Sequence, residues 1–429
     1  MAKSVRFARR KRSSFKKRRA QIGKKSKVAR VRRSRRRVKV MRGGAGPKNI
    51  LLIIDPQIGF CEGGPLAVPG ATNDLNLLIS FLQSNPEFFS EIHVSLDSHT
   101  NTHIAHKGFW KTDVAVFNEL TLKDDKIVNG SNLDCKAKQI GDFDPTPLAK
   151  RYIELMSKLK GTITSDKPTP IIWPTHCIKP NYEGEAQSTE DVATGWALYE
   201  PLRTQLDSMV ESKTIKYHEK GTNDLVEMYS IFSAEVPFKQ VYDSFSDNYD
   251  YQQKIKNAYT LYFKGESSEE NDVPDEVTGI FKANALPNYN TQFNLKLFKQ
   301  LFGNPGADLN NVYICGEAKT HCVKTTIEDL YNTIQHGINN DDNVLRKAGY
   351  DIKNLKTILK NIHIIDNVSS SILGGIDAPG QYIIPMQLSF AEMHKNGVNF
   401  VEIDSTNAIK PSNLIRSGGE NVEDVNLSK

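Results

Sequence analysis

Short apolar runs, most of them followed by a polar residue, alternate along the chain with segments of helical periodicity. Runs of this length and apolarity are typical of parallel strands buried on both faces. The expected strands are residues 49–55, 91–96, 170–173, 214–218, 311–315 and 362–365. The expected helices are residues 73–83, 292–302, 323–335 and 389–395. This alternation predicts an α/β fold, a doubly wound and mostly parallel sheet with helices on both faces.

Polar or reactive side chains follow the ends of five of these strands. They are Asp55, Asp97 with Ser98 and His99, His176, Lys220 and Cys322. Ligands of doubly wound sheets bind beyond the carboxyl ends of the strands. We therefore expect these side chains to meet in one site.

Cys322 lies in a turn between an expected strand and an expected helix, where a thiol can be held as the thiolate beside backbone N–H groups. Asp55 could deprotonate it, and Lys220 could stabilise the thiolate and a developing oxyanion. Such a set attacks a carbonyl and expels an amine through an acyl-thioester, which water then hydrolyses. The alternatives are a buried structural cysteine, a helix-capping Asp55 and a solvated Lys220.

Asp97, His99 and His176 supply one carboxylate and two imidazoles. This set suits one divalent metal ion, zinc first, with iron or manganese as alternatives. His103 and His106 are candidates for a fourth ligand or for a contact that orients a ligand. The alternative for each histidine is an ordinary surface position near a turn.

Charge divides the chain into a basic arm and an acidic body. The first 48 residues hold 22 Lys and Arg and no Asp or Glu, which leaves 34 basic and 50 acidic residues in the remainder. Such an arm gains affinity for nucleic acid by counterion release. Its densest basic positions are Arg9, Arg10, Lys11, Arg12, Lys16, Lys17, Arg18, Arg19, Arg35, Arg36 and Arg37. The alternative is a nuclear or nucleolar targeting signal. A mitochondrial presequence fits the arm less well, because it would show more apolar amphipathic content.

These patterns predict that the chain has three parts. Residues 1–47 are expected to be a disordered arm and linker, and residues 405–429 a polar tail. Residues 48–404 are expected to form a globular domain with insertions near 111–168, 181–210 and 236–290. The five cysteines show no CxxC or disulfide spacing, which favours a reducing intracellular compartment. With the arm, this indicates the nucleus, the nucleolus or a virion. The apolar runs are too short to span a membrane. The sequence leaves open whether the chain forms a homo-oligomer or a larger assembly.

Five blocks of the sequence resemble the motifs of nicotinamidases in the isochorismatase-like cysteine hydrolase superfamily, in the same order. The blocks are Asp55–Ala71, Asp97–His103, Trp173–Cys177, Lys220–Phe232 and Gly316–Val323. Ser98 and Thr100 replace the usual Trp and Pro, and Lys319 and Thr320 replace the usual Thr-Asp. The basic arm has no counterpart in ordinary nicotinamidases.

The resemblance implies a role for each matched position. It makes Cys322 the nucleophile, Asp55 the general base and Lys220 the third member of a triad. It assigns the metal to Asp97, His99 and His176, where the ion would orient the pyridine nitrogen of nicotinamide and a water. It assigns the oxyanion hole to the amides of Ala318 and Cys322, with a cis peptide at Glu317–Ala318. It assigns the pocket wall to Gln57, Phe60, Trp110 and Tyr229.

Three functions remain in view. The first is hydrolysis of nicotinamide to nicotinate and ammonia by a metal-dependent cysteine amidohydrolase. The second is a structural component of a virion or ribonucleoprotein, in which the fold serves as a module tethered to nucleic acid. The third is a hydrolase of another small amide or a vinyl ether, although isochorismatases proper generally lack the metal residues found here at Asp97, His99 and His176.

Overall fold

The computed structural model describes nine stretches of the chain. They are residues 46–110, 114–129, 134–135, 143–159, 170–179, 195–260, 263, 290–372 and 382–412. Residues 1–45 of the predicted arm and residues 413–429 of the predicted tail lie outside the described residues. Within the described residues, no helix combines the length and apolarity that a membrane crossing requires.

Seven strands form the central sheet, in the order β10-β9-β8-β7-β1-β2-β6. Their bounds are β1 Asn49–Ile54, β2 Glu91–Asp97, β6 Thr214–Lys220, β7 Asn311–Gly316, β8 Ile362–Ile365, β9 Asn399–Ile403 and β10 Ile409–Pro411. All neighbouring strands are parallel except β9 and β10. β1 lies between β2 and β7, and its residues Ile50 to Ile54 are fully buried. The predicted doubly wound, mostly parallel sheet is therefore confirmed.

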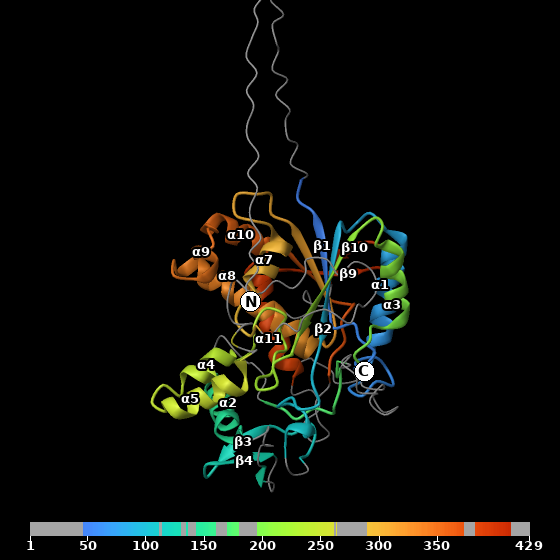
Figure 1. Cartoon of the computed structure of the whole chain (residues 1–429). Helices are drawn as coiled ribbons and strands as arrows, with labels where there is room; N and C mark the ends of the chain where they lie inside the picture. Colours follow the sequence, from blue (N-terminus) through green and yellow to red (C-terminus); the bar gives the residue numbers. More distant parts are fainter. Residues whose placement is uncertain are drawn as a thin grey trace, which may run out of the picture. The chain divides into compact units, whose positions relative to one another are not determined.

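Helices cover both faces of this sheet (Figure 1). On one side lie α1 Ala71–Ser84 and α3 Glu200–Met209. On the other side lie α7 Leu295–Phe302, α8 Lys324–Asn339, α9 Val344–Lys347, α10 Ile352–Lys360 and α11 Ile383–Lys395. Each packs because its apolar residues recur at helical spacing, as Leu75, Leu78 and Leu82 do on α1. Helix α3 occupies part of the region near 181–210, and its Leu202 and Leu206 belong to the main core.

A second hydrophobic cluster forms from the regions predicted as insertions near 111–168 and 236–290. It contains a small antiparallel sheet of β3 Leu120–Lys123, β4 Lys126–Asn129 and β5 Asp134–Cys135, and the helices α2 Thr146–Leu159, α4 Phe238–Asp243 and α5 Tyr249–Ala258. Tyr152 on α2 and Phe238 on α4 are fully buried in it. The two regions, far apart in sequence, therefore share one core. Their helices α2, α4 and α5 and strands β3 and β4 lie together at the lower end of Figure 1.

One predicted strand is wrong. Residues 170–173 lie outside the sheet, where Ile171 and Trp173 make only isolated bridges to Glu119 and His106. This segment instead joins the second cluster to the main core, since Ile172 packs in the former and Trp173 in the latter. The strands β9 and β10 at the edge of the sheet were not expected from the sequence.

Candidate active site and metal centre

The carboxyl ends of four neighbouring strands bring the predicted site together. Asp55 follows β1, Asp97 ends β2, Lys220 ends β6 and is paired with Asp97, and Cys322 lies in a π-helical turn, Lys319–Val323, after β7. The crossover direction of the chain reverses beside β1, which is where doubly wound sheets bind ligands.

Two backbone features fix this edge of the sheet. Gly316 has φ of 119°, and a Cβ there would lie 2.1 Å from the carbonyl oxygen of Ile54, so only glycine allows β7 to approach β1 this closely. Asp55 itself adopts φ of 44°, an uncommon conformation for a residue with a side chain. The peptide bond Glu317–Ala318 is cis, as the resemblance implies.

Lys220 is the centre of the charged cluster. Its Nζ lies 3.0 Å from Asp55 Oδ2, 2.9 Å from Asp97 Oδ1 and 3.6 Å from Cys322 Sγ, and it also donates to the Met228 carbonyl at 3.3 Å. The side chain is 1% exposed. Burial alone would lower the pKa of Lys220, but the carboxylates of Asp55 and Asp97 outweigh burial and raise it, so the ammonium is retained.

Cys322 holds its proton in this pocket. Burial raises the pKa of its thiol well above the ordinary value, and Lys220 opposes that rise only in part. Lys220 contacts both the Cys322 sulfur and the Asp55 carboxylate, and the pKa of Asp55 is itself raised, first by burial. Ser95 orients this carboxylate, because its hydroxyl donates to Asp55 Oδ1 at 2.6 Å and accepts from the Asp55 amide at 3.0 Å. The arrangement places a base beside a thiol that needs one.

The predicted metal ligands converge on one carboxylate oxygen. Asp97 Oδ2 lies 3.0 Å from His99 Nε2 and 3.3 Å from His176 Nε2. The opposite ring nitrogens face backbone carbonyls, His99 Nδ1 at 3.0 Å from Gly221 and His176 Nδ1 at 2.7 Å from Pro174. Hydrogen bonds of this kind fix the ring so that Nε2 is available as a ligand.

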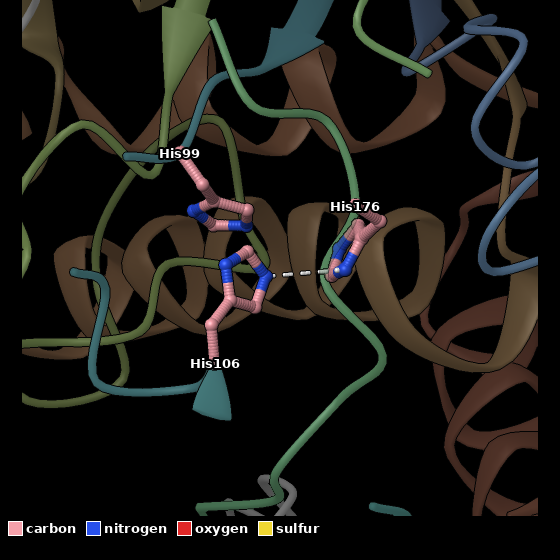
Figure 2. Close-up of side chains that lie close together, drawn as sticks. All are labelled: His99, His106 and His176. Carbon is pink, nitrogen blue, oxygen red and sulfur yellow. Dashed lines mark hydrogen bonds between the residues drawn. The ribbon is translucent and has the colours of Figure 1, made fainter. Parts of the chain in front are cut away.

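His106 joins these two histidines (Figure 2). Its Nε2 lies 3.2 Å from His176 Nδ1, and the three rings offer nitrogens within 4.8 Å of one another. Its Nδ1 is buried and has no hydrogen-bond partner in the described part of the chain. His103, the other sequence candidate, forms a second such group with His99 and Glu227.

Glu227 is a site residue that the sequence reasoning missed. Its side chain is buried, Oε2 has no hydrogen-bond partner among the described residues, and burial raises the pKa of the carboxyl above its usual value. The Tyr152 hydroxyl accepts from the Glu227 amide at 2.9 Å, so the second cluster supports this loop. The available signal was one acidic residue in the apolar run from Leu225 to Met228.

The donor set fits a divalent cation. Carboxylate and imidazole groups converge, and the unpartnered atoms of His106 and Glu227 lie beside the predicted ligands. Oxygen and imidazole nitrogen are the usual ligands of zinc, and iron and manganese accept the same set.

A pocket opens between the nucleophile and these ligands. It is lined by Phe60, Leu66, Asp97, His99, Trp173, His176, Glu227, Tyr229, Ala318, His321, Cys322 and Ile372. The predicted wall residues Phe60 and Tyr229 are among them, and so is Ala318. Trp173 and His321 were not predicted to line the pocket, although both lie inside the motif blocks Trp173–Cys177 and Gly316–Val323.

Two predicted wall residues lie elsewhere. The Gln57 side chain donates to the carbonyls of Asp97 and Trp196 and accepts from the Asp97 amide, so it holds β2 in place and is absent from the pocket lining. Trp110 packs against Phe109 in the second cluster and donates to the Ile104 carbonyl. Its indole is therefore part of that core.

No protein-family model matches this chain, and no curated protein matches its sequence. Among solved structures, the chain is similar to a nicotinamidase/pyrazinamidase of Acinetobacter baumanii, at 15% identity over 83% of this chain and 97% of that chain, with a TM-score of 0.38. The yeast nicotinamidase Pnc1p bound to nicotinaldehyde is 15% identical over 82% and 99%, with a TM-score of 0.39. A Pyrococcus horikoshii pyrazinamidase in complex with zinc is 14% identical over 83% and 99%, with a TM-score of 0.32. Because these identities and TM-scores are low, the chemistry of the chain has to be judged from its own residues.

Proposed function

We propose that this chain is a metal-dependent cysteine amidohydrolase that converts nicotinamide, or a related small planar amide, to the acid and ammonia. The observation that carries the proposal is the contact of Lys220 with Asp55, Asp97 and Cys322 in one buried cluster, two members of which, Asp97 and Cys322, line the pocket. A buried lysine between two carboxylates and a thiol is costly to assemble for packing alone, and such clusters are typical of functional sites.

In the first half of the proposed reaction, Asp55 takes the proton of the Cys322 thiol as Sγ attacks the carbonyl carbon. Lys220, 3.6 Å from Sγ, stabilises the sulfur while it is negative. The amides of Ala318 and Cys322 are proposed to hold the oxyanion. The C–N bond then breaks, and Asp55 returns the proton to the leaving nitrogen, so that ammonia departs and an acyl-thioester remains on Cys322.

In the second half, Asp55 takes a proton from water while the oxygen attacks the thioester carbon. The C–S bond breaks, the acid leaves, and the proton returns to Cys322, so the enzyme is regenerated without any redox step. A bound divalent metal ion would supply Lewis-acid polarisation and a fixed position for a substrate nitrogen or a water. Asp97, His99 and His176 would hold it, with His103, His106 and Glu227 within reach.

The lining of the pocket supports a flat, uncharged substrate. Phe60, Trp173 and Tyr229 provide aromatic walls, and the Trp173 indole donates to the Tyr229 hydroxyl at 2.9 Å, which keeps both rings in place. Aromatic faces bind planar rings well.

The proposed function is tested by an ammonia-release screen of the full chain over nicotinamide, pyrazinamide and other small amides, with metal analysis of the same sample. Absence of turnover on every amide, with metal bound, would overturn the proposal.

Metal removal gives a first prediction. Stripping the full chain with a chelator is expected to lower kcat/KM about tenfold or more, because substrate orientation and polarisation are lost. The domain should stay folded, since Asp97 keeps its contacts with Lys220 and the histidines. Rates before and after zinc is restored measure the first effect, and circular dichroism the second. A rate that does not change after verified metal removal would contradict the assigned ligands.

The basic arm gives a second prediction. We propose that residues 1–47 bind nucleic acid through phosphate contacts, a proposal that rests on their charge in the sequence. The full chain should bind a duplex DNA or RNA oligonucleotide, and this binding should weaken steeply with added NaCl. Deleting residues 1–47 should abolish the binding. Ammonia release should be unchanged. Binding that persists after the deletion would refute the role of the arm, because another part of the chain would then make the contacts with the nucleic acid.

A further inference from the structure

His321, the residue before the nucleophile, carries a ring nitrogen that has no hydrogen-bond partner in the part of the chain that the structure describes. The side chain is 2% exposed and lines the pocket, and its Nε2 is buried without a hydrogen-bond partner among the described residues. A buried polar atom left unpaired costs about 1–3 kcal/mol, so such atoms generally have a partner. Because His321 lines the pocket, a bound ligand is the natural partner for this nitrogen.

The neighbouring Thr320 decides which ring nitrogen of His321 carries the hydrogen. Thr320 Oγ1 accepts from the Ile372 amide at 3.1 Å and lies 3.0 Å from His321 Nδ1. If the hydroxyl donates to Nδ1, only the Nε2–H group is left unpaired. If Nδ1–H donated instead, both the hydroxyl hydrogen and Nε2 would lack partners in the described part of the chain. The first arrangement leaves fewer buried groups unpaired, and it makes Nε2–H a hydrogen-bond donor.

The imidazole of His321 is neutral and held in place. Burial, with a smaller effect of Lys324, lowers the pKa of His321 to about 3. Aromatic rings surround it: the centroid of Trp173 lies at 5.2 Å, that of Tyr229 at 5.7 Å and that of Tyr382 at 4.6 Å. A neutral donor with a fixed direction selects ligands by the position of their acceptor atoms.

We propose that His321, oriented by Thr320, is a specificity-determining residue that donates a hydrogen bond from Nε2 to a substrate acceptor other than the scissile carbonyl oxygen. This inference rests on the proposed function and narrows its substrate class. The class is neutral heteroaromatic carboxamides whose ring carries a nitrogen or carbonyl acceptor facing His321, distinct from any ring nitrogen that the metal would hold. Carbocyclic amides such as benzamide lack that acceptor and would leave Nε2–H unpaired.

The proposal is tested by calorimetric binding to the full chain carrying Cys322→Ala, which cannot turn the amides over. The ligands are pyrazinamide, nicotinamide and benzamide, which carry two, one and no ring nitrogens. Adding His321→Phe should weaken binding of at least one nitrogen-containing ligand about tenfold relative to benzamide, the worth of one neutral hydrogen bond. His321→Gln, which keeps an N–H donor, should retain part of the preference. Thr320→Val should reduce it, because Nδ1 is then free to take the hydrogen.

His363→Phe is the matched control. His363 is a partly buried histidine on β8 that stacks on Tyr313 and is absent from the pocket lining, so its replacement should leave the ligand preference unchanged. An equal preference in the His321→Phe protein and its parent would overturn the inference and leave the proposed function standing. Failure of all three amides to bind the Cys322→Ala protein would overturn the proposed function for these amides, and the inference with it.

Discussion

Replacing Cys322 with alanine is expected to lower the rate of amide hydrolysis by about four orders of magnitude or more. The reason is that the acyl-thioester cannot form, while the remaining donors supply only the residual catalysis seen when a nucleophile is lost. Substrate affinity should change little, because the aromatic walls and the metal ligands are intact. The check is single-turnover kinetics of ammonia release, together with a binding measurement on the same variant.

Cys315→Ala is the matched control for this variant. Cys315 is also a buried thiol, but it lies within β7 and outside the pocket lining. Burial raises the pKa of this thiol as well, so low exposure does not distinguish the two cysteines. The control should lose some stability and keep its rate. Equal rates for Cys322→Ala and the unaltered chain would remove Cys322 from the mechanism.

Replacing Lys220 with methionine is expected to remove activity and also to destabilise the fold. The ammonium is the cation that Asp55 and Asp97 contact at 3.0 and 2.9 Å, and its loss leaves two buried carboxylates with less compensation. Breaking a buried ion pair by removing one partner costs about 3–5 kcal/mol. Urea unfolding measures the loss, which should be present at neutral pH.

The pH range follows from the directions of the two pKa shifts. The pKa of Lys220 is raised, so the stabilisation is present below pH 10.5 and is lost as the pH rises through the folded-state pKa. The pKa of Asp97 is lowered because His99 and Lys220 outweigh burial, so its stabilisation is present above pH 3.8 and is lost as the pH falls further. The effect of Lys220→Met should therefore be present at neutral pH and should shrink as the pH falls, because the carboxylates left without their cation then take up protons.

Lys216→Met provides the comparison, since it makes the same change on the same strand. Lys216 pairs with Glu91 at 2.7 Å and is 18% exposed, so water partly screens the pair and its loss should cost about 1 kcal/mol or less. If Lys220→Met and Lys216→Met lowered the free energy of unfolding equally, the charge cluster at Lys220 would not have the role assigned to it.

The sheet was predictable because its central strands are buried on both faces and therefore read as continuous apolar runs. β1, with Ile50 to Ile54 fully buried, is the clearest case. Residues 170–173 show the limit of this signal, because a short apolar run beside prolines looks the same whether it pairs in a sheet or bridges two cores. The edge strand β10 has only three residues, one of them proline, and gives almost no pattern.

The convergence of Asp55, Asp97, Lys220 and Cys322 was predictable because carboxyl ends of neighbouring parallel strands meet at one edge. The positions of side chains that lie on loops could not be predicted in this way. Trp110 belongs to a core built from two distant regions. The side-chain amide of Gln57 donates to the backbone carbonyls of Asp97 on β2 and of Trp196. Glu227 and His321 become visible as site residues through their place in the pocket lining and their unpartnered atoms, which are properties of the folded structure.

The most direct test of the proposed mechanism is peptide mapping by mass spectrometry of the full, metal-loaded chain, acid-quenched during turnover of nicotinamide. We expect ammonia release together with an acyl group on the peptide that contains Cys322, and neither in the Cys322→Ala protein. Ammonia release that continues in the Cys322→Ala protein, or turnover with the acyl group on another residue, would contradict it.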